Sequence, residues 1–143
     1  ILVCLVGSEM CIRDRNLSME HVLIVHGFDG LDEITITNKT YVAELKDNSI
    51  NEYEISPKDF GLNFGQLSEI IAQSSDDSLQ LIREAFSGEK SAVQDMIALN
   101  SGAALYLANE VHSIADGVEL SFELMNNGMA ADKLASYVRV SNS

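Results

Sequence analysis

The sequence of 143 residues is poor in basic side chains, and this scarcity limits the partners it can bind. Lysine and arginine together number 9 against 22 aspartates and glutamates, so the formal net charge is −13. A surface of that sign repels nucleic-acid phosphates and anionic lipid headgroups. We therefore expect no nucleic-acid partner and no membrane partner. A simpler interpretation of the negative charge is that it only keeps the protein soluble.

Cysteine and long apolar runs are also scarce. The two cysteines, Cys4 and Cys11, both lie in the first dozen residues, so neither a disulfide framework nor zinc-ligand spacing can be built from them. No apolar run approaches the roughly 20 residues that a membrane helix needs. The apolar start at residues 1–6 lacks the basic segment of a signal peptide. These absences together predict a cytoplasmic protein.

Residues 1–15 do not fit the rest of the sequence. They contain both cysteines and two of the four arginines, and their pattern matches neither an amphipathic helix nor an alternating strand. The stretch is similar to translated adapter sequence, so we expect a non-native N-terminal extension over residues 1–15. On this reading, native sequence upstream of Asn16 is absent. The alternative is a genuine strand at residues 1–6.

The first part of the remaining chain has the character of strands. An apolar run at residues 21–26 ends at Gly27, which is typical of a strand buried on both faces in a parallel sheet. Residues 34–37 alternate in the manner of a strand, and further strands are expected at 41–45 and 50–55. The turn residues Asp47 and Asn48 predict a hairpin between the last two.

The second part, from about residue 66, has the character of helices. The first predicted helix stops at Gly88, and a second begins at a capping box formed by Ser91 and Gln94. That second helix is apolar nearly all round, which indicates a central position. The predicted helices cover about 79–86, 92–108, 111–125 and 130–138. Few strands followed by several helices predict an α/β fold with a partial central sheet and packed helices.

The loop after the first strand carries a recognisable motif. The run HGFDGLDE at residues 26–33 resembles the HGxDGLDE signature of the anthranilate phosphoribosyltransferases. Further matches follow in the family's order, at residues 42–45, 55–62, 99–108, 117–118 and 128–130. Two stretches depart from the family, since residues 73–77 lack its usual glycines and Ser101-Gly102 replaces small alanines. The resemblance identifies residues 16–143 as the C-terminal part of a phosphorylase/phosphoribosyltransferase-type catalytic α/β domain.

The resemblance implies a reaction and a metal site. The family transfers a phosphoribosyl group from phosphoribosyl pyrophosphate to anthranilate in tryptophan biosynthesis, and Mg²⁺ stabilises the departing pyrophosphate. Mg²⁺ prefers hard oxygen ligands, and an adjacent acidic pair after a strand supplies them. By resemblance, Asp32 and Glu33 are the metal-binding pair. Judged by spacing alone, the same two residues are better read as ordinary solvated loop acids, because adjacent acids in a loop are common in a chain with 22 acidic residues.

Several family motifs are missing from the sequence. There is no glycine-rich GTGGD donor loop, no lysine–histidine–glycine–asparagine motif, and no arginine in an apolar setting for the anthranilate carboxylate. The helical domain through which the family forms homodimers is missing as well. We therefore expect this chain alone to be inactive. The alternatives are a non-catalytic nucleic-acid-binding paralogue of the same fold and a related nucleoside phosphorylase.

Three other polar residues receive structural interpretations. His26 closes an apolar strand and is read as a core histidine. Asp29 lies between two glycines, and we expect it to hold the loop through hydrogen bonds to nearby backbone N–H groups. Asn100, in an apolar helix, is expected to satisfy a buried polar partner, with a role in a pocket as the alternative.

Overall fold

The computed structural model describes residue 12, residue 16 and residues 19–142. The chain divides into two compact units, Ile1–Phe64 and Gly65–Ser143. The predicted extension at residues 1–15, and the alternative strand at 1–6, lie almost wholly outside the described residues. Within the described part, no helix combines the length and the apolar character that crossing a bilayer requires.

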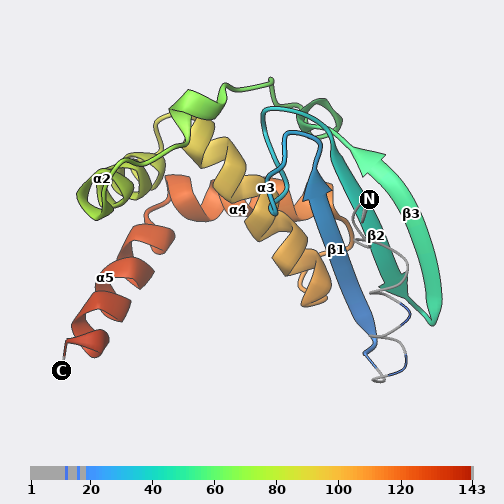
Figure 1. Cartoon of the computed structure of the whole chain (residues 1–143). Helices are drawn as coiled ribbons and strands as arrows, with labels where there is room; N and C mark the ends of the chain where they lie inside the picture. The colour runs from blue at the N-terminus through green and yellow to red at the C-terminus, as the bar shows by residue number, and fades with distance from the viewer. Residues whose placement is uncertain (1–11, 13–15, 17–18, 143) are drawn as a thin grey trace. The chain divides into compact units, whose positions relative to one another are not determined.

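The first unit contains an antiparallel sheet of the strands β1 (His21–Gly27), β2 (Thr40–Lys46) and β3 (Ser49–Ile55). Figure 1 shows them side by side, with β2 in the middle. One core cluster of the sheet is built on Ala43 and Leu45 of β2, which are fully buried. Half-buried side chains pack against these two residues, namely Val22, Ile24, Tyr41 and Ile50.

The hairpin between β2 and β3 forms where the sequence predicted it. Lys46 pairs with Ser49, which leaves Asp47 and Asn48 as a two-residue turn with φ angles of 49° and 61°. Two positive φ angles define the turn type that matches the twist of antiparallel strands, and Asp and Asn tolerate this region. After β3, the 3₁₀ helix η1 (Pro57–Phe60) begins with a capping box from Ser56 to Asp59.

Two strand predictions were wrong in detail. β1 pairs antiparallel with β2 rather than as part of a parallel sheet, and its side chains are half-buried. Residues 34–37 form no strand, although they alternate. Ile34, Thr35 and Ile36 are all buried, so the alternation of apolar and polar residues does not correspond to one buried and one solvent-exposed face. Threonine hydroxyls instead accept hydrogen bonds from backbone N–H groups of this loop, from Thr35 to Thr40 Oγ1 and from Thr37 to Thr35 Oγ1. In a strand, these N–H groups would pair with a neighbouring strand.

The second unit contains the 3₁₀ helix η2 (Leu67–Glu69) and four α-helices. The helices are α2 (Ser75–Ala85), α3 (Ala92–Leu107), α4 (Ile114–Asn126) and α5 (Met129–Ser141). Serine side chains cap the first three: Ser74, Ser91 and Ser113 each accept a hydrogen bond of 3.1 Å from a backbone N–H in the first turn. The described part of the chain thus confirms an α/β fold with a partial sheet and packed helices.

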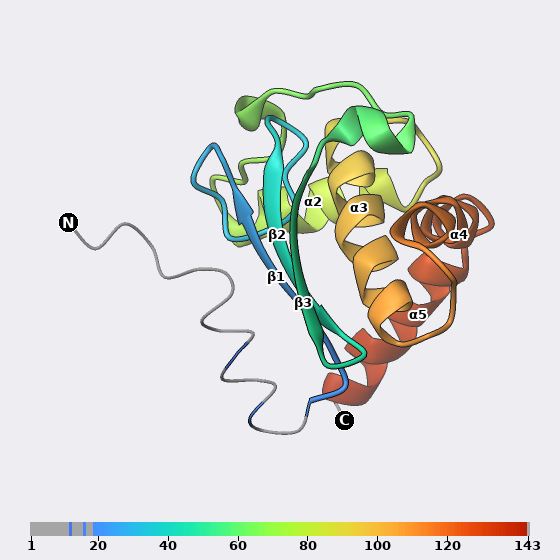
Figure 2. The ribbon, with the colours of Figure 1, turned by 90° about the vertical axis from the view of Figure 1, so that its right-hand side faces the viewer.

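The helices α3 and α4 form the centre of this unit and pack against one another. They cross in Figure 1, and in Figure 2 α4 is seen nearly end-on beside α3. The crossing depends on Gly102 and Gly117. A Cβ atom placed on Gly102 would lie 2.6 Å from the backbone nitrogen of Val118, and one on Gly117 would lie 2.8 Å from the Gly102 Cα. Real Cβ contacts are longer than this, so the two helices approach as closely as they do only because both residues lack a side chain.

The capping box at α3 was only half right. Ser91 caps the helix as predicted, but the Gln94 side chain does not return to the Ser91 backbone. It donates to the Ala85 carbonyl at 3.0 Å and to Asn126 Oδ1 at 3.2 Å, and the residue is 1% exposed. Gln94 therefore connects the end of α2 to the end of α4, where an unpaired helix-terminal carbonyl would be costly to bury.

Candidate functional site

The motif at residues 26–33 covers the end of β1 and the start of a loop that leads to β2. Three backbone hydrogen bonds close this loop. The Phe28 N–H donates to the Lys39 carbonyl at 2.9 Å, the Gly27 N–H to the Leu31 carbonyl at 2.8 Å, and the Gly30 N–H to the Gly27 carbonyl at 2.9 Å. The loop therefore has a fixed base where β1 ends and a tight turn immediately beyond it.

The two glycines of the motif serve different purposes. Gly30 has a backbone φ angle of 94°, which residues other than glycine rarely adopt. Gly27 is buried, and a Cβ there would lie 2.5 Å from Asp29 Oδ1 and 3.2 Å from the Leu31 carbonyl oxygen. Gly27 thus leaves the space that the Asp29 carboxylate occupies, whereas Gly30 permits the turn itself.

The Asp29 carboxylate is the centre of the loop's hydrogen bonding. Its Oδ1 accepts from the Leu31 backbone N–H at 3.2 Å, and its Oδ2 accepts from the Thr35 hydroxyl at 2.6 Å and from the Thr37 hydroxyl. Partial burial raises the pKa of Asp29, but the hydrogen bonds from Thr35, Thr37 and the backbone outweigh it and lower the pKa overall. The expectation that Asp29 holds the loop through backbone N–H groups is confirmed, and the two hydroxyls extend it.

The side chains of Asp32 and Glu33 are exposed, and the chain directly after them is anchored. Ile34 is 3% and Ile36 is 0% exposed. In the described residues, neither Asp32 nor Glu33 forms an ion pair with a lysine or arginine. The nearby Lys39 is engaged elsewhere, since its Nζ lies 2.9 Å from Glu54 Oε2 and this hydrogen bond raises the pKa of Lys39.

The chemistry of this pair suits a magnesium ion that is also bound by a substrate. Two carboxylates without a competing cation provide hard oxygen ligands, and Mg²⁺ takes its remaining ligands from water and phosphates. Over the described residues, no three histidine, cysteine, aspartate or glutamate side chains converge to enclose a metal. Asp32 and Glu33 thus offer two solvent-exposed carboxylates of the hard-oxygen type that Mg²⁺ prefers.

The structure also shows the positions of the two other polar residues singled out in the sequence, His26 and Asn100. His26 is half-buried on β1, next to buried Gly27. The Asn100 side chain donates to the Met96 carbonyl at 3.0 Å, one turn back along α3. Sequence reasoning missed the parts played by Thr35 and Thr37. No local sequence signal marked these two roles, because they arise from the way the loop folds back onto Asp29.

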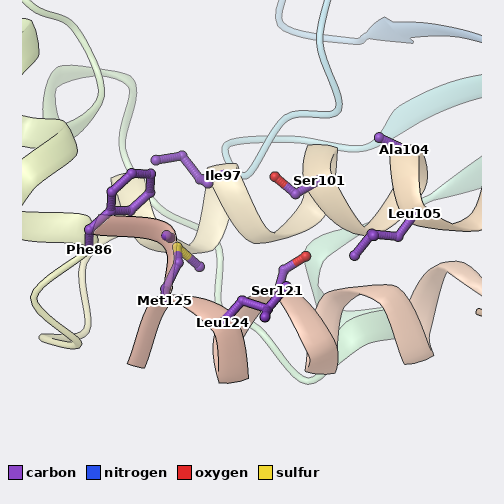
Figure 3. Close-up of a pocket in the computed structure, with 9 residues that line it drawn as sticks. Phe86, Ile97, Ser101, Ala104, Leu105, Ser121, Leu124 and Met125 are labelled. Carbon is purple, nitrogen blue, oxygen red and sulfur yellow. The ribbon is translucent and has the colours of Figure 1, made fainter. Parts of the chain in front are cut away.

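A separate cavity of about 370 Å³ lies in the second unit between α3 and α4. Figure 3 shows Phe86 and Met125 at one end and Ala104 and Leu105 at the other. Its polar lining groups are the hydroxyls of Ser101 and Ser121, and that of Ser121 donates to the Gly117 carbonyl at 2.8 Å. No titratable side chain lines the cavity, so it offers no acid, base or charged ligand for chemistry.

Comparisons with known proteins agree on one family. The glycosyl transferase family, a/b domain, matches residues 9–131. The anthranilate phosphoribosyltransferase of Vesicomyosocius okutanii is 43% identical over 127 residues, which cover 89% of this chain and 38% of that protein. This chain therefore spans well under half the length of the curated relatives it matches.

Solved structures give the same result. The crystal structure of anthranilate phosphoribosyltransferase from Thermus thermophilus matches with a TM-score of 0.84 and 28% identity, over 95% of this chain and 40% of that one. A variant of the Saccharomyces cerevisiae enzyme with Mg bound matches with a TM-score of 0.70 and 25% identity, over 80% of this chain and 34% of that one. The chain belongs to the glycosyl transferase family, whose a/b domain it carries, and it corresponds to a part of the anthranilate phosphoribosyltransferases.

Proposed function

We propose that this chain is the C-terminal part of the catalytic domain of an anthranilate phosphoribosyltransferase, with residues 16–143 as its native portion. The full-length enzyme would take phosphoribosyl pyrophosphate and anthranilate and release N-(5-phosphoribosyl)anthranilate and pyrophosphate. Support for this enzyme class comes from the motif at residues 26–33, from the family match over residues 9–131, and from relatives of 43% identity that carry this name. The boundary at residue 16 stays a prediction, because the family match already begins at residue 9.

Within that enzyme, we assign Asp32 and Glu33 to magnesium binding. When bound, Mg²⁺ acts as a Lewis acid on the pyrophosphate leaving group. Asp32 and Glu33 would hold the ion through their carboxylate oxygens, and the closed loop would fix where those oxygens lie. The observation that carries the assignment is the exposure of both carboxylates, unpaired with any cation of the described chain, on a loop that is anchored on either side.

The proposal also concerns what this chain does alone. The donor loop and the anthranilate arginine have no counterpart in its sequence, so we expect no phosphoribosyl transfer from the isolated chain. A homodimer through an N-terminal helical domain, and a cytoplasmic location, stay predictions for the full-length enzyme. Neither the nucleic-acid-binding paralogue nor the nucleoside phosphorylase gains support, because the net charge is −13 and the relatives are named as transferases.

A hybrid enzyme tests the function directly. Residues 16–143 would replace the matching part of the Vesicomyosocius okutanii enzyme, and transfer to anthranilate would be followed by fluorescence. We expect Mg²⁺-dependent turnover that the double variant Asp32→Asn/Glu33→Gln reduces by at least tenfold. The matched control is Asp76→Asn/Asp77→Asn, an adjacent exposed acidic pair at the start of α2.

Two results would contradict the proposal. A folded hybrid without any transfer activity would remove the assigned reaction. A hybrid whose Mg²⁺ dependence is the same in both double variants would retain the reaction but remove the metal assignment. The control is informative because it deletes the same two charges from another exposed site, so general electrostatic effects are matched.

A further inference from the structure

The motif at residues 26–33 contains three acidic side chains, and the structure separates them into two kinds. Asp32 and Glu33 are exposed and form no ion pair in the described part of the chain. Asp29, in contrast, uses both of its carboxylate oxygens within the loop, with Oδ1 on a backbone N–H and Oδ2 on two hydroxyls. Asp29 is therefore occupied as a hydrogen-bond acceptor rather than open to a cation.

The positions of its partners show what the Asp29 carboxylate does. Leu31 comes immediately before the acidic pair, and Thr35 comes two residues after it. The carboxylate thus joins the two ends of a five-residue segment, 31–35, whose middle contains Asp32 and Glu33. Any displacement of this segment would stretch one of the two attachments.

Further contacts hold the far side of the same segment. The Thr35 N–H donates to Thr40 Oγ1 at 3.0 Å, and the Thr37 N–H donates to Thr35 Oγ1 at 3.0 Å. Ile34, the residue between Glu33 and Thr35, is 3% exposed. The backbone that carries the two free carboxylates is therefore fixed by hydrogen bonds and burial, while the carboxylates themselves reach solvent.

We propose that Asp29 is a positioning residue, which fixes the segment 31–35 so that Asp32 and Glu33 are presented together to a divalent cation. The inference rests on the metal assignment made above. Residues that hold metal ligands in place without touching the metal commonly change metal affinity when they are altered. A preorganised pair binds more tightly than one whose loop must be ordered on binding.

The test combines a metal-independent and a metal-dependent readout on the whole 143-residue chain. Amide hydrogen exchange of residues 31–35 reports the order of the segment, and Mn²⁺ titration followed by electron paramagnetic resonance reports affinity. Thr35→Val removes one partner of Asp29, and with it the acceptor of the Thr37 N–H, without changing charge or shape. Thr35→Ser keeps the hydroxyl and both hydrogen bonds. Asp29→Ala removes the acceptor itself. Its matched control is Glu52→Ala, which removes one negative charge from an exposed position of β3.

We expect Thr35→Val and Asp29→Ala to speed exchange at residues 31–35 and to weaken Mn²⁺ binding by about tenfold. Thr35→Ser should retain both properties, and Glu52→Ala should leave both unchanged. Circular dichroism of each variant establishes that the sheet remains folded.

The outcomes separate this inference from the proposal on which it rests. Unchanged exchange in both Thr35→Val and Asp29→Ala would overturn the positioning role, whatever the metal does. Faster exchange with unchanged Mn²⁺ affinity would also overturn it, because the loop's order would then not matter for binding. Wild-type Mn²⁺ affinity that survives Asp32→Asn/Glu33→Gln would instead remove the metal assignment itself.

Discussion

The close crossing of α3 and α4 allows a prediction in which two effects of opposite sign compete. Gly102→Ala would improve the helix propensity of α3 by about 1 kcal/mol if nothing else changed. The new methyl, however, would lie 2.6 Å from the Val118 backbone nitrogen and 2.9 Å from the Gly117 carbonyl carbon. Backbone atoms within a helix cannot move aside individually, so the two helices must separate.

The magnitude follows from the balance of these effects. Overpacking of this kind costs about 1–3 kcal/mol, and the backbone contact places Gly102→Ala towards the upper end. After subtraction of the propensity gain, we expect a net loss of about 1–2 kcal/mol. For a unit of the size of Gly65–Ser143, this corresponds to a fall in melting temperature of about 4–16 °C.

Thermal unfolding by circular dichroism, with hydrogen exchange of α3 and α4, measures this effect. Ala104→Gly measures the difference in helix propensity between alanine and glycine separately, because Ala104 lies in α3 at the rim of the cavity and its side chain is exposed. The double variant Gly102→Ala/Gly117→Ala should lose less than the sum of the two single variants, since both methyl groups occupy one gap. A melting temperature that rises in Gly102→Ala would refute the close-packing argument.

Three other substitutions or conditions give simpler predictions. Gln94→Leu leaves the Ala85 carbonyl without its partner, so urea unfolding should show a loss of about 1–3 kcal/mol. Ser91→Ala removes the cap of α3 and should cost about 1 kcal/mol in the same assay. The lowered pKa of Asp29 means that its contribution to stability is complete above the unfolded pKa of about 3.9 and is lost as pH falls through the lower folded value. Unfolding measured from pH 6 to pH 2 should therefore show a smaller acid loss in Asp29→Asn than in the wild type, and equal losses would contradict the hydrogen-bonded role.

Local sequence signals predicted those elements whose geometry depends on neighbouring residues. The Asp47-Asn48 turn, the cap at Ser91 and the helix stop near Gly88 all follow from backbone preferences within a few residues, and the structure confirms them. The antiparallel pairing of β1 was not predictable in this way, because an apolar run looks alike in either sheet type. Gln94 was misread for a related reason: its spacing from Ser91 fits a capping box, but a carbonyl nine residues upstream takes its side chain.

The candidate site shows the same division. The motif identified Asp32 and Glu33 as ligand candidates, and the glycines around Asp29 predicted a held loop. The hydroxyls of Thr35 and Thr37 remained unrecognised, because alternation at residues 34–37 favoured a strand in which they would point to one face. Their role depends on how the loop folds back onto Asp29, which spacing along the chain does not specify.

The account depends most on the presence of a divalent cation at Asp32 and Glu33. Nuclear magnetic resonance of the 143-residue chain with substoichiometric Mn²⁺ tests this directly, because the paramagnetic ion broadens amide signals close to it. We predict selective broadening of residues 31–34, abolished by Asp32→Asn/Glu33→Gln and retained in Asp76→Asn/Asp77→Asn. Broadening that centres elsewhere, or that persists at residues 31–34 in the first double variant, would contradict the central claim.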